Sequence, residues 1–136
     1  MQNNELQSMG EVLKTAPEAS SLTWGYSMYP MLRPHKDIVT VSRVNGELKK
    51  GDVVLYPGSD GKYILHRIIK IKDGKYIIRG DNTYKKELWV TDDHIVGVLG
   101  GFYRNGKYRS IEDKGYKFYV KLNMISYPLR FVYFKC

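Results

Sequence analysis

The feature that most constrains the fold of this chain is a succession of short β-branched runs divided by turn dipeptides. The run 37–44, DIVTVSRV, alternates apolar and polar residues, which is typical of a strand with one buried face. Two further runs, 63–72 and 76–79, flank Asp73-Gly74. An Asx-Gly pair between such runs indicates a tight hairpin. We therefore expect a mainly β fold with many antiparallel pairs.

The rest of the chain extends this pattern. Further strands are expected at 20–25, 53–56 and 94–103, with a short return strand after Asn105-Gly106. The segments expected outside the strands are a helical turn within 26–32, a loop over 80–90, an amphipathic helix within 5–15 and an irregular helix over 114–135 that Pro128 should kink or stop.

A chain of 136 residues fits one domain with one substantial core. Its 43% hydrophobic content and twelve Tyr argue against disorder, and no repeat or linker divides it. We expect a single domain over 1–136, with a helical segment at 1–19, a β core at 20–110 and a basic aromatic helix at 114–135.

The only cysteine, Cys136, is the last residue, so an internal disulfide and a thiolate metal site are both excluded. No cofactor or metal is expected. The first 20 residues carry neither a secretory signal nor an apolar run. These features predict a cytoplasmic protein, with peripheral contact at the inner membrane face as an option.

The net charge of +8 is unevenly placed, since residues 97–136 hold eight Lys/Arg and two acids. Such a basic end could meet an anionic membrane, an acidic peptide or nucleic acid, or could simply be a solvated surface. Nucleic acid is not favoured, because no helix-turn-helix, zinc-finger or RNA-binding signature accompanies the charge. For Lys114 to Lys135, two interpretations remain open: attachment to anionic lipid, and packing of the helix on the core.

Three fragments supply the side chains of a hydrolytic serine centre. Ser27 lies in a tight turn after Gly25, and His66 follows 39 residues later in the middle of an expected strand. A serine hydroxyl needs a neighbouring base to accept its proton, and an imidazole of near-neutral pKa suits that role. Asp81, or Glu87 six residues on, could orient the imidazole.

Each residue also has a plainer interpretation. Ser27 could be an ordinary turn serine, and Asp81 a turn former. His66 could simply pack against Ile64 and Ile68 on its own face of the strand. These alternatives stay open for each residue taken alone.

Six blocks in order narrow the choice: GYSMYPML, KDIVTV, LKKGDVVLY, ILHRIIKI, RGDN and IVGVL. Over about residues 20 to 100 this series resembles the S24/S26 peptidases, the superfamily of signal peptidases and LexA-type self-cleaving repressors. The resemblance implies a bent-strand β fold and a serine nucleophile at Ser27. Bacterial signal peptidases and the repressors carry a lysine where this chain has His66, so the match is to the archaeal and endoplasmic-reticulum type.

The resemblance further implies Asp81 or Glu87 as the third catalytic member and the backbone N–H groups of Tyr26 and Ser27 as the oxyanion hole. Glu87 departs from the aspartate usual in that loop. The expected substrate is an extended peptide or precursor protein cut through an acyl-enzyme at Ser27, in a bacterial stand-alone catalytic domain without a membrane anchor.

Two other classes remain as alternatives: a catalytically inactive peptide-binding module, and a LexA-like regulatory domain. The sequence does not define the oligomeric state.

Overall fold

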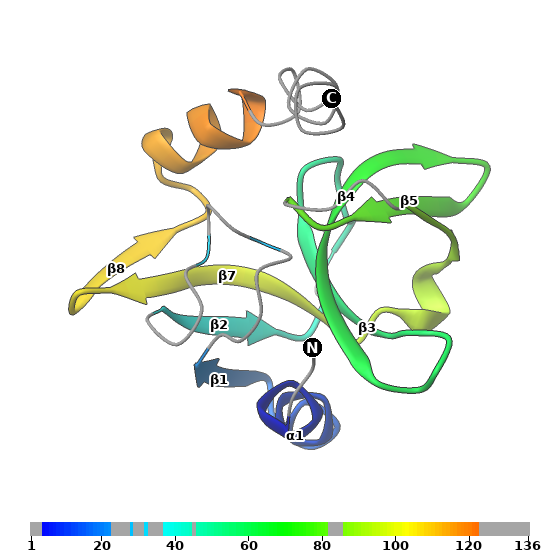
Figure 1. Ribbon diagram of the computed structural model, residues 1–136, viewed down its shortest axis with the longest axis horizontal. Helices are drawn as coiled ribbons and strands as arrows, with labels where there is room; N and C mark the ends of the chain where they lie inside the picture. Colours follow the sequence, from blue (N-terminus) through cyan, green and yellow to red (C-terminus); the bar gives the residue numbers. More distant parts are fainter. Residues whose placement is uncertain are drawn as a thin grey trace, which may run out of the picture.

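In the computed structural model of the chain, residues 4–22, 28, 32, 37–44, 46–81 and 86–122 are described. They form eight strands in one antiparallel sheet, with a helix near each end of the chain (Figure 1). The elements are α1 (Asn4–Val12), β1 (Glu18–Leu22), β2 (Ile38–Ser42), β3 (Val53–Pro57), β4 (Tyr63–Lys72), β5 (Lys75–Arg79), β6 (Glu87–Val90), the 3₁₀ turn η1 (Asp92–His94), β7 (Gly97–Arg104), β8 (Lys107–Ser110) and a C-terminal helix over 114–122. The mainly β prediction with a helix near each end is confirmed.

The sheet runs in the order β1-β2-β7-β3-β4-β5-β6, and β8 pairs with the far part of β7. The sheet is curled, so β1, β2, β7 and β8 form one half and β3 to β6 the other (Figure 1). Strand β7 joins the halves by pairing with both β2 and β3. Each neighbouring pair is antiparallel.

Two hairpins have the predicted Asx-Gly turns. Asp73 and Gly74 between β4 and β5 have φ of 52° and 76°, and Asn105 and Gly106 between β7 and β8 have φ of 53° and 78°. Positive φ at both central residues matches the right-handed twist of the flanking strands, and Asx and Gly tolerate it best. The residue choice at these turns therefore sets the register of both hairpins.

The apolar run of β3 packs on both faces. Val53 and Leu55 contribute to one buried cluster, whereas Val54 and Tyr56 contribute to another. The first cluster comprises Met9, Leu13, Ala19, Met28, Leu32, Val39, Val41, Val53, Leu55, Leu65, Leu99 and Phe102. The second cluster comprises Leu48, Val54, Tyr56, Ile68, Tyr76, Ile78, Val90 and Ile95. Successive side chains of a strand point to opposite faces, so β3 and β4 separate the two clusters.

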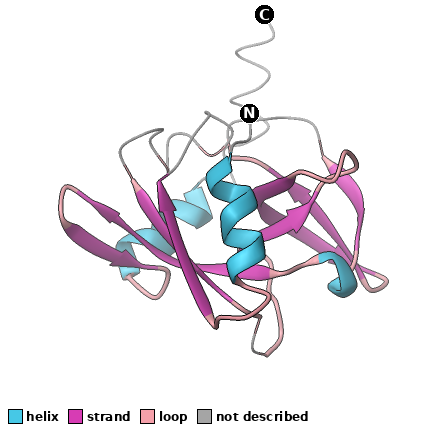
Figure 2. Cartoon of the chain, turned by 90° about the horizontal axis from the view of Figure 1, so that it is seen from below, coloured by secondary structure: helices cyan, strands magenta, loops and turns pink. Residues whose placement is uncertain are grey.

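Met9 of helix α1 and Leu13 directly after it pack in the first cluster. Figure 2 shows the helix lying against the strands. Gly10 brings the helix backbone close to β4, because an added Cβ there would meet the Tyr63 ring at 2.3 Å. The helix thus lies against the start of the strand that carries His66.

Several boundaries differ from the predicted ones. Strand β1 begins at Glu18, two residues early, and the predicted loop 80–90 contains β6. His94 ends a 3₁₀ turn and does not begin a strand. Predicted features at 23–27 and 123–135 lie outside the described residues, as do Tyr26 and Ser27, the residues expected to form the oxyanion hole and the nucleophile.

Candidate active site

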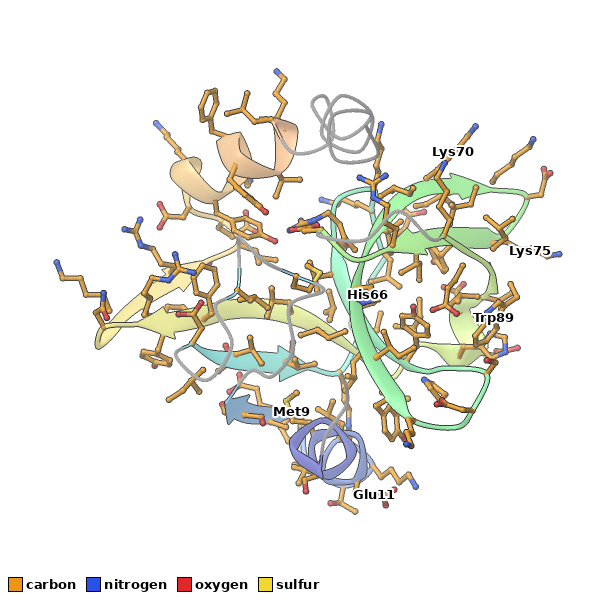
Figure 3. The ribbon with its side chains drawn as sticks, viewed as in Figure 1. Met9, Glu11, His66, Lys70, Lys75 and Trp89 are labelled. Atoms are coloured by element: carbon orange, nitrogen blue, oxygen red, sulfur yellow. The ribbon has the colours of Figure 1, made fainter. Side chains whose placement is uncertain are left out.

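Strand β4 places His66 close to the centre of the molecule (Figure 3). Its backbone pairs with Val54 of β3, and its side chain shares a strand face with Ile64 and Ile68, as alternation predicts. Ile68 is fully buried in the second cluster and Ile64 packs against it. His66 therefore lies on the second-cluster side of β4, whereas Arg67 points to the first.

Burial lowers the pKa of the His66 imidazole from 6.5 to about 4, because a charged ring would lose its hydration there. The negative charges of Glu87 and then Asp81 oppose this effect only in part. At neutral pH the ring is uncharged, so one ring nitrogen carries a lone pair that can accept a proton. No hydrogen bond to the ring comes from the side chains within 46–81 or 86–122.

The next residue, Arg67, forms a buried ion pair with Asp81. Arg67 Nε lies 2.7 Å from Asp81 Oδ1, and Nη2 lies 2.8 Å from Oδ2. This two-bond geometry matches the planar guanidinium to a carboxylate. The side chains of Arg67 and Asp81 are 0% and 1% exposed. The register places Arg67 opposite Arg79, so Asp81, two residues beyond, returns to the same face of the hairpin.

The ion pair is surrounded by further donors and acceptors. Arg67 Nη1 donates to the Gly51 carbonyl at 2.7 Å and to Tyr116 Oη at 3.2 Å. Tyr119 donates its hydroxyl to Asp81 Oδ2 at 3.0 Å. The guanidinium also lies 5.7 Å from the Tyr116 ring centroid and 5.9 Å from that of Tyr119. These contacts compensate the desolvation of both charges and dock the C-terminal helix on β4.

Asp81 also contacts the residue that follows Ser27. Its backbone N–H donates to the Met28 thioether sulfur at 3.3 Å. Met28 is buried in the first cluster, and its carbonyl accepts the N–H of Leu32 at 3.0 Å. Tyr26 and Ser27 lie outside the described residues.

Glu87 opens β6 and faces the second cluster. It pairs in register with Ile78, and its carboxylate accepts the hydroxyl of Tyr56 and, at 3.2 Å, the indole N–H of Trp89. Burial, followed by the bond to Glu87, raises the pKa of Tyr56, so the phenol stays protonated as a donor. Trp89 in turn meets Tyr56 and His94 edge to face.

The two candidate acids thus differ in what they contact. The described hydrogen bonds of Asp81 join it to Arg67, Tyr119 and Met28, and none joins it to His66. Glu87 lies on the His66 side of the sheet and exerts the stronger charge effect on that imidazole. Within the described ranges, neither carboxylate is hydrogen-bonded to the ring.

Sequence reasoning missed the residues that support these groups. Strand alternation could have shown that Arg67 faces away from His66, and the hairpin register could have shown that Asp81 returns toward Arg67. Tyr56 carried no such signal, because its contact with Glu87 depends on the missed strand β6. Tyr116 and Tyr119 were noted only as aromatic residues of a basic helix.

Within the described ranges, no group of three or more His, Cys, Asp or Glu side chains is arranged to hold a metal ion. None of the helices described in the chain has the length and apolarity of a membrane span. No protein-family model matches the chain, and no curated protein matches it significantly. The candidate site therefore rests on its own residues and geometry.

Proposed function

We propose that this protein is a serine peptidase of the signal-peptidase-like type, with Ser27 as nucleophile and His66 as general base. Ser27 Oγ attacks the scissile carbonyl while His66 accepts its proton. His66 then returns that proton to the leaving amine as the C–N bond breaks, which leaves an ester at Ser27. Water hydrolyses the ester and restores the hydroxyl. The backbone N–H groups of Tyr26 and Ser27 are the proposed donors to the oxyanion.

The observation that carries the proposal is the contact between Met28 and Asp81, together with the ion pair of Asp81 and Arg67. Met28 follows Ser27, and Arg67 follows His66. Consecutive Cα atoms are about 3.8 Å apart, so each proposed catalytic residue is one peptide unit from a residue that contacts Asp81. Met28 and Arg67, which are 39 residues apart in sequence, are thereby held together on the first-cluster side of β4, while the His66 ring lies on the second-cluster side.

The environment of His66 supports its proposed role as a base. A partly buried, neutral imidazole has a lone pair available to accept a proton. A charge that develops on the ring during attack would be stabilised by a nearby carboxylate. We propose Glu87 for that role, because it affects the imidazole more than Asp81 does. Asp81 then acts mainly by holding Arg67 and Met28.

The proposed substrate is an extended peptide or precursor protein. In the described part of the sheet, β1 and β6 each pair with a single neighbour, and a peptide can bind a sheet edge as an added strand. Strand β1 ends at Leu22, five residues before Ser27, so a peptide along this edge could lead to the nucleophile.

Incubation with a proteome-derived peptide library, read by mass spectrometry for new termini, tests the proposal. We expect defined cleavages by the parent protein. We expect Ser27→Ala and His66→Asn each to lose about 10³-fold or more in rate, because the nucleophile and the base act as a unit. Ser59→Ala is the matched control, because Ser59 is an exposed serine in the turn between β3 and β4 and should leave cleavage unchanged.

A folded parent protein that produces no new termini would contradict the proposal and favour the peptide-binding module. Cleavage that survives Ser27→Ala would contradict the assigned nucleophile. Thermal melting of each variant separates loss of chemistry from loss of fold.

A further inference from the structure

The C-terminal helix over 114–122 is fixed to the body of the protein by one face. Tyr116 and Tyr119 bond to the buried pair of Arg67 and Asp81, and both rings pack against the first cluster. A helix held in this way presents its opposite face to the outside in one orientation. Figure 1 shows the helix along the outer side of the molecule, beside β7 and β8.

The outward face combines exposed apolar and basic side chains. Phe118 is 63% exposed and Leu122 is 48% exposed, although both are large and apolar. Lys114, Lys117 and Lys121 are exposed as well. At about 100° per residue, these five residues occupy an arc of about 140°, with the tyrosines on the other side. One face of the helix is therefore packed on the body of the protein, and the opposite face carries both apolar and cationic side chains.

The charge of this region favours an anionic partner. The acids directly before the helix are Glu112 and Asp113, and Glu112 pairs with Lys117 at 3.0 Å. The chain beyond residue 122 adds Arg130 and Lys135 and no acid. Apolar side chains bordered by lysines are the pattern of a helix that lies in a bilayer interface, where the lysine stems lie along the apolar surface and their charges meet lipid phosphates.

We propose that this face of the C-terminal helix binds the surface of an anionic lipid bilayer, with Phe118 and Leu122 inserted and the lysines at the headgroups. Both interpretations of the basic helix then hold, one for each face: the tyrosine face packs on the core and the lysine face meets lipid. The proposal does not depend on peptide hydrolysis. It would place the peptidase, if active, at a membrane surface.

Co-sedimentation of the full chain with phosphatidylcholine vesicles, with and without phosphatidylglycerol, tests this. We expect binding that requires the anionic lipid and weakens with added salt. Lys114→Gln with Lys121→Gln should lower the partition coefficient roughly 30-fold. The matched control is Lys72→Gln with Lys75→Gln, the same charge change in the exposed β4–β5 hairpin, which should change it less than about twofold.

A second pair of variants tests insertion. Leu122→Ser should lower binding roughly tenfold, since a partly exposed leucine loses its contact with the bilayer. Leu88→Ser, at a 58% exposed leucine on β6, is the control and should have no effect.

Three results would overturn the proposal. Sedimentation could be equal with and without anionic lipid. The helix and hairpin lysine variants could lose binding equally, which would show a response to net charge alone. Leu122-dependent self-association in the absence of vesicle binding would assign the face to a second copy of the chain.

Discussion

Adjacent residues of β4 show two ways of accommodating a titratable side chain, with Arg67 fully buried and His66 partly buried. Arg67 keeps its charge and is satisfied by Asp81, Tyr116 and the Gly51 carbonyl. His66, on the other face, is kept neutral mainly by burial, and Glu87 exerts a larger charge effect on its imidazole than Asp81 does. A charge with a full set of partners stabilises one geometry, whereas a neutral ring keeps a lone pair for a proton. We infer that Arg67 stabilises the geometry of the candidate site and that His66 is the group that accepts a proton there.

The largest expected effect comes from removing one partner of the buried pair. Arg67→Met leaves the Asp81 carboxylate buried without its guanidinium, which should cost about 3–5 kcal/mol of unfolding free energy in urea titration. Lys117→Met breaks the exposed pair with Glu112 and should cost less than about 1 kcal/mol. Equal losses in the two variants would show that the buried pair contributes no more to stability than the exposed pair.

The double variant Arg67→Met with Asp81→Leu tests whether the lost stability comes from the unpaired carboxylate. It removes both charges and should recover much of the lost stability, because apolar residues of similar volume often replace a buried pair without penalty. If the double variant is as unstable as Arg67→Met, the loss is due to packing and not to an unpaired carboxylate.

The second largest expected effect is a pH dependence of stability that is caused by His66. The imidazole has a pKa of 6.5 in its unperturbed state and about 4 in the folded protein, so the unfolded chain binds more protons between these values. Stability should therefore be complete above pH 6.5 and fall as the pH is lowered toward 4, by up to about 3 kcal/mol.

The measurement is the difference in unfolding free energy between the parent protein and His66→Gln across this pH range, since other groups titrate in both. A difference that does not change with pH would contradict a desolvated imidazole.

A smaller effect is expected at the C-terminal helix. Tyr119→Phe removes the hydroxyl that donates to Asp81 Oδ2 and should cost about 1.5–3 kcal/mol, as for hydrogen bonds to charged groups. Tyr108→Phe is a suitable control, because Tyr108 is 47% exposed and should lose under about 0.5 kcal/mol. Urea titration of both variants gives the comparison, and a loss in Tyr108→Phe as large as in Tyr119→Phe would contradict it.

The smallest expected effect separates the two acids. Glu87→Gln removes the charge that most favours protonation of His66, so the imidazole pKa should fall further, by a fraction of a unit. Leu88→Gln, the adjacent exposed position, should leave it unchanged. An NMR titration measures the His66 pKa in both variants. A rise in that pKa after Glu87→Gln would reject Glu87 as the stabilising carboxylate.

Much of the framework could be predicted from local patterns. The Asx-Gly turns set the β4–β5 and β7–β8 hairpins, and alternation placed His66 with Ile64 and Ile68. Strand β6 was missed, because ELWV has no turn signals of its own and forms by pairing with β5. A short strand of this kind depends on its partner more than on its own propensity.

The partners of Asp81 were harder to predict for the same reason. Its contacts with Met28 and Tyr119 span 53 and 38 residues, so no local pattern encodes them. Sequence alone could propose two acids near His66, but it could not show that Arg67 binds one of them. The assignment of Glu87 over Asp81 needed the packing of both sheet faces.

The most direct test of this account is an NMR titration of the His66 imidazole in the parent protein, assigned by comparison with His66→Asn. The account predicts a ring that stays neutral down to a pKa of about 4. A pKa at or above 6.5 would show a solvated or charge-paired imidazole and contradict the proposal that His66 is a neutral base.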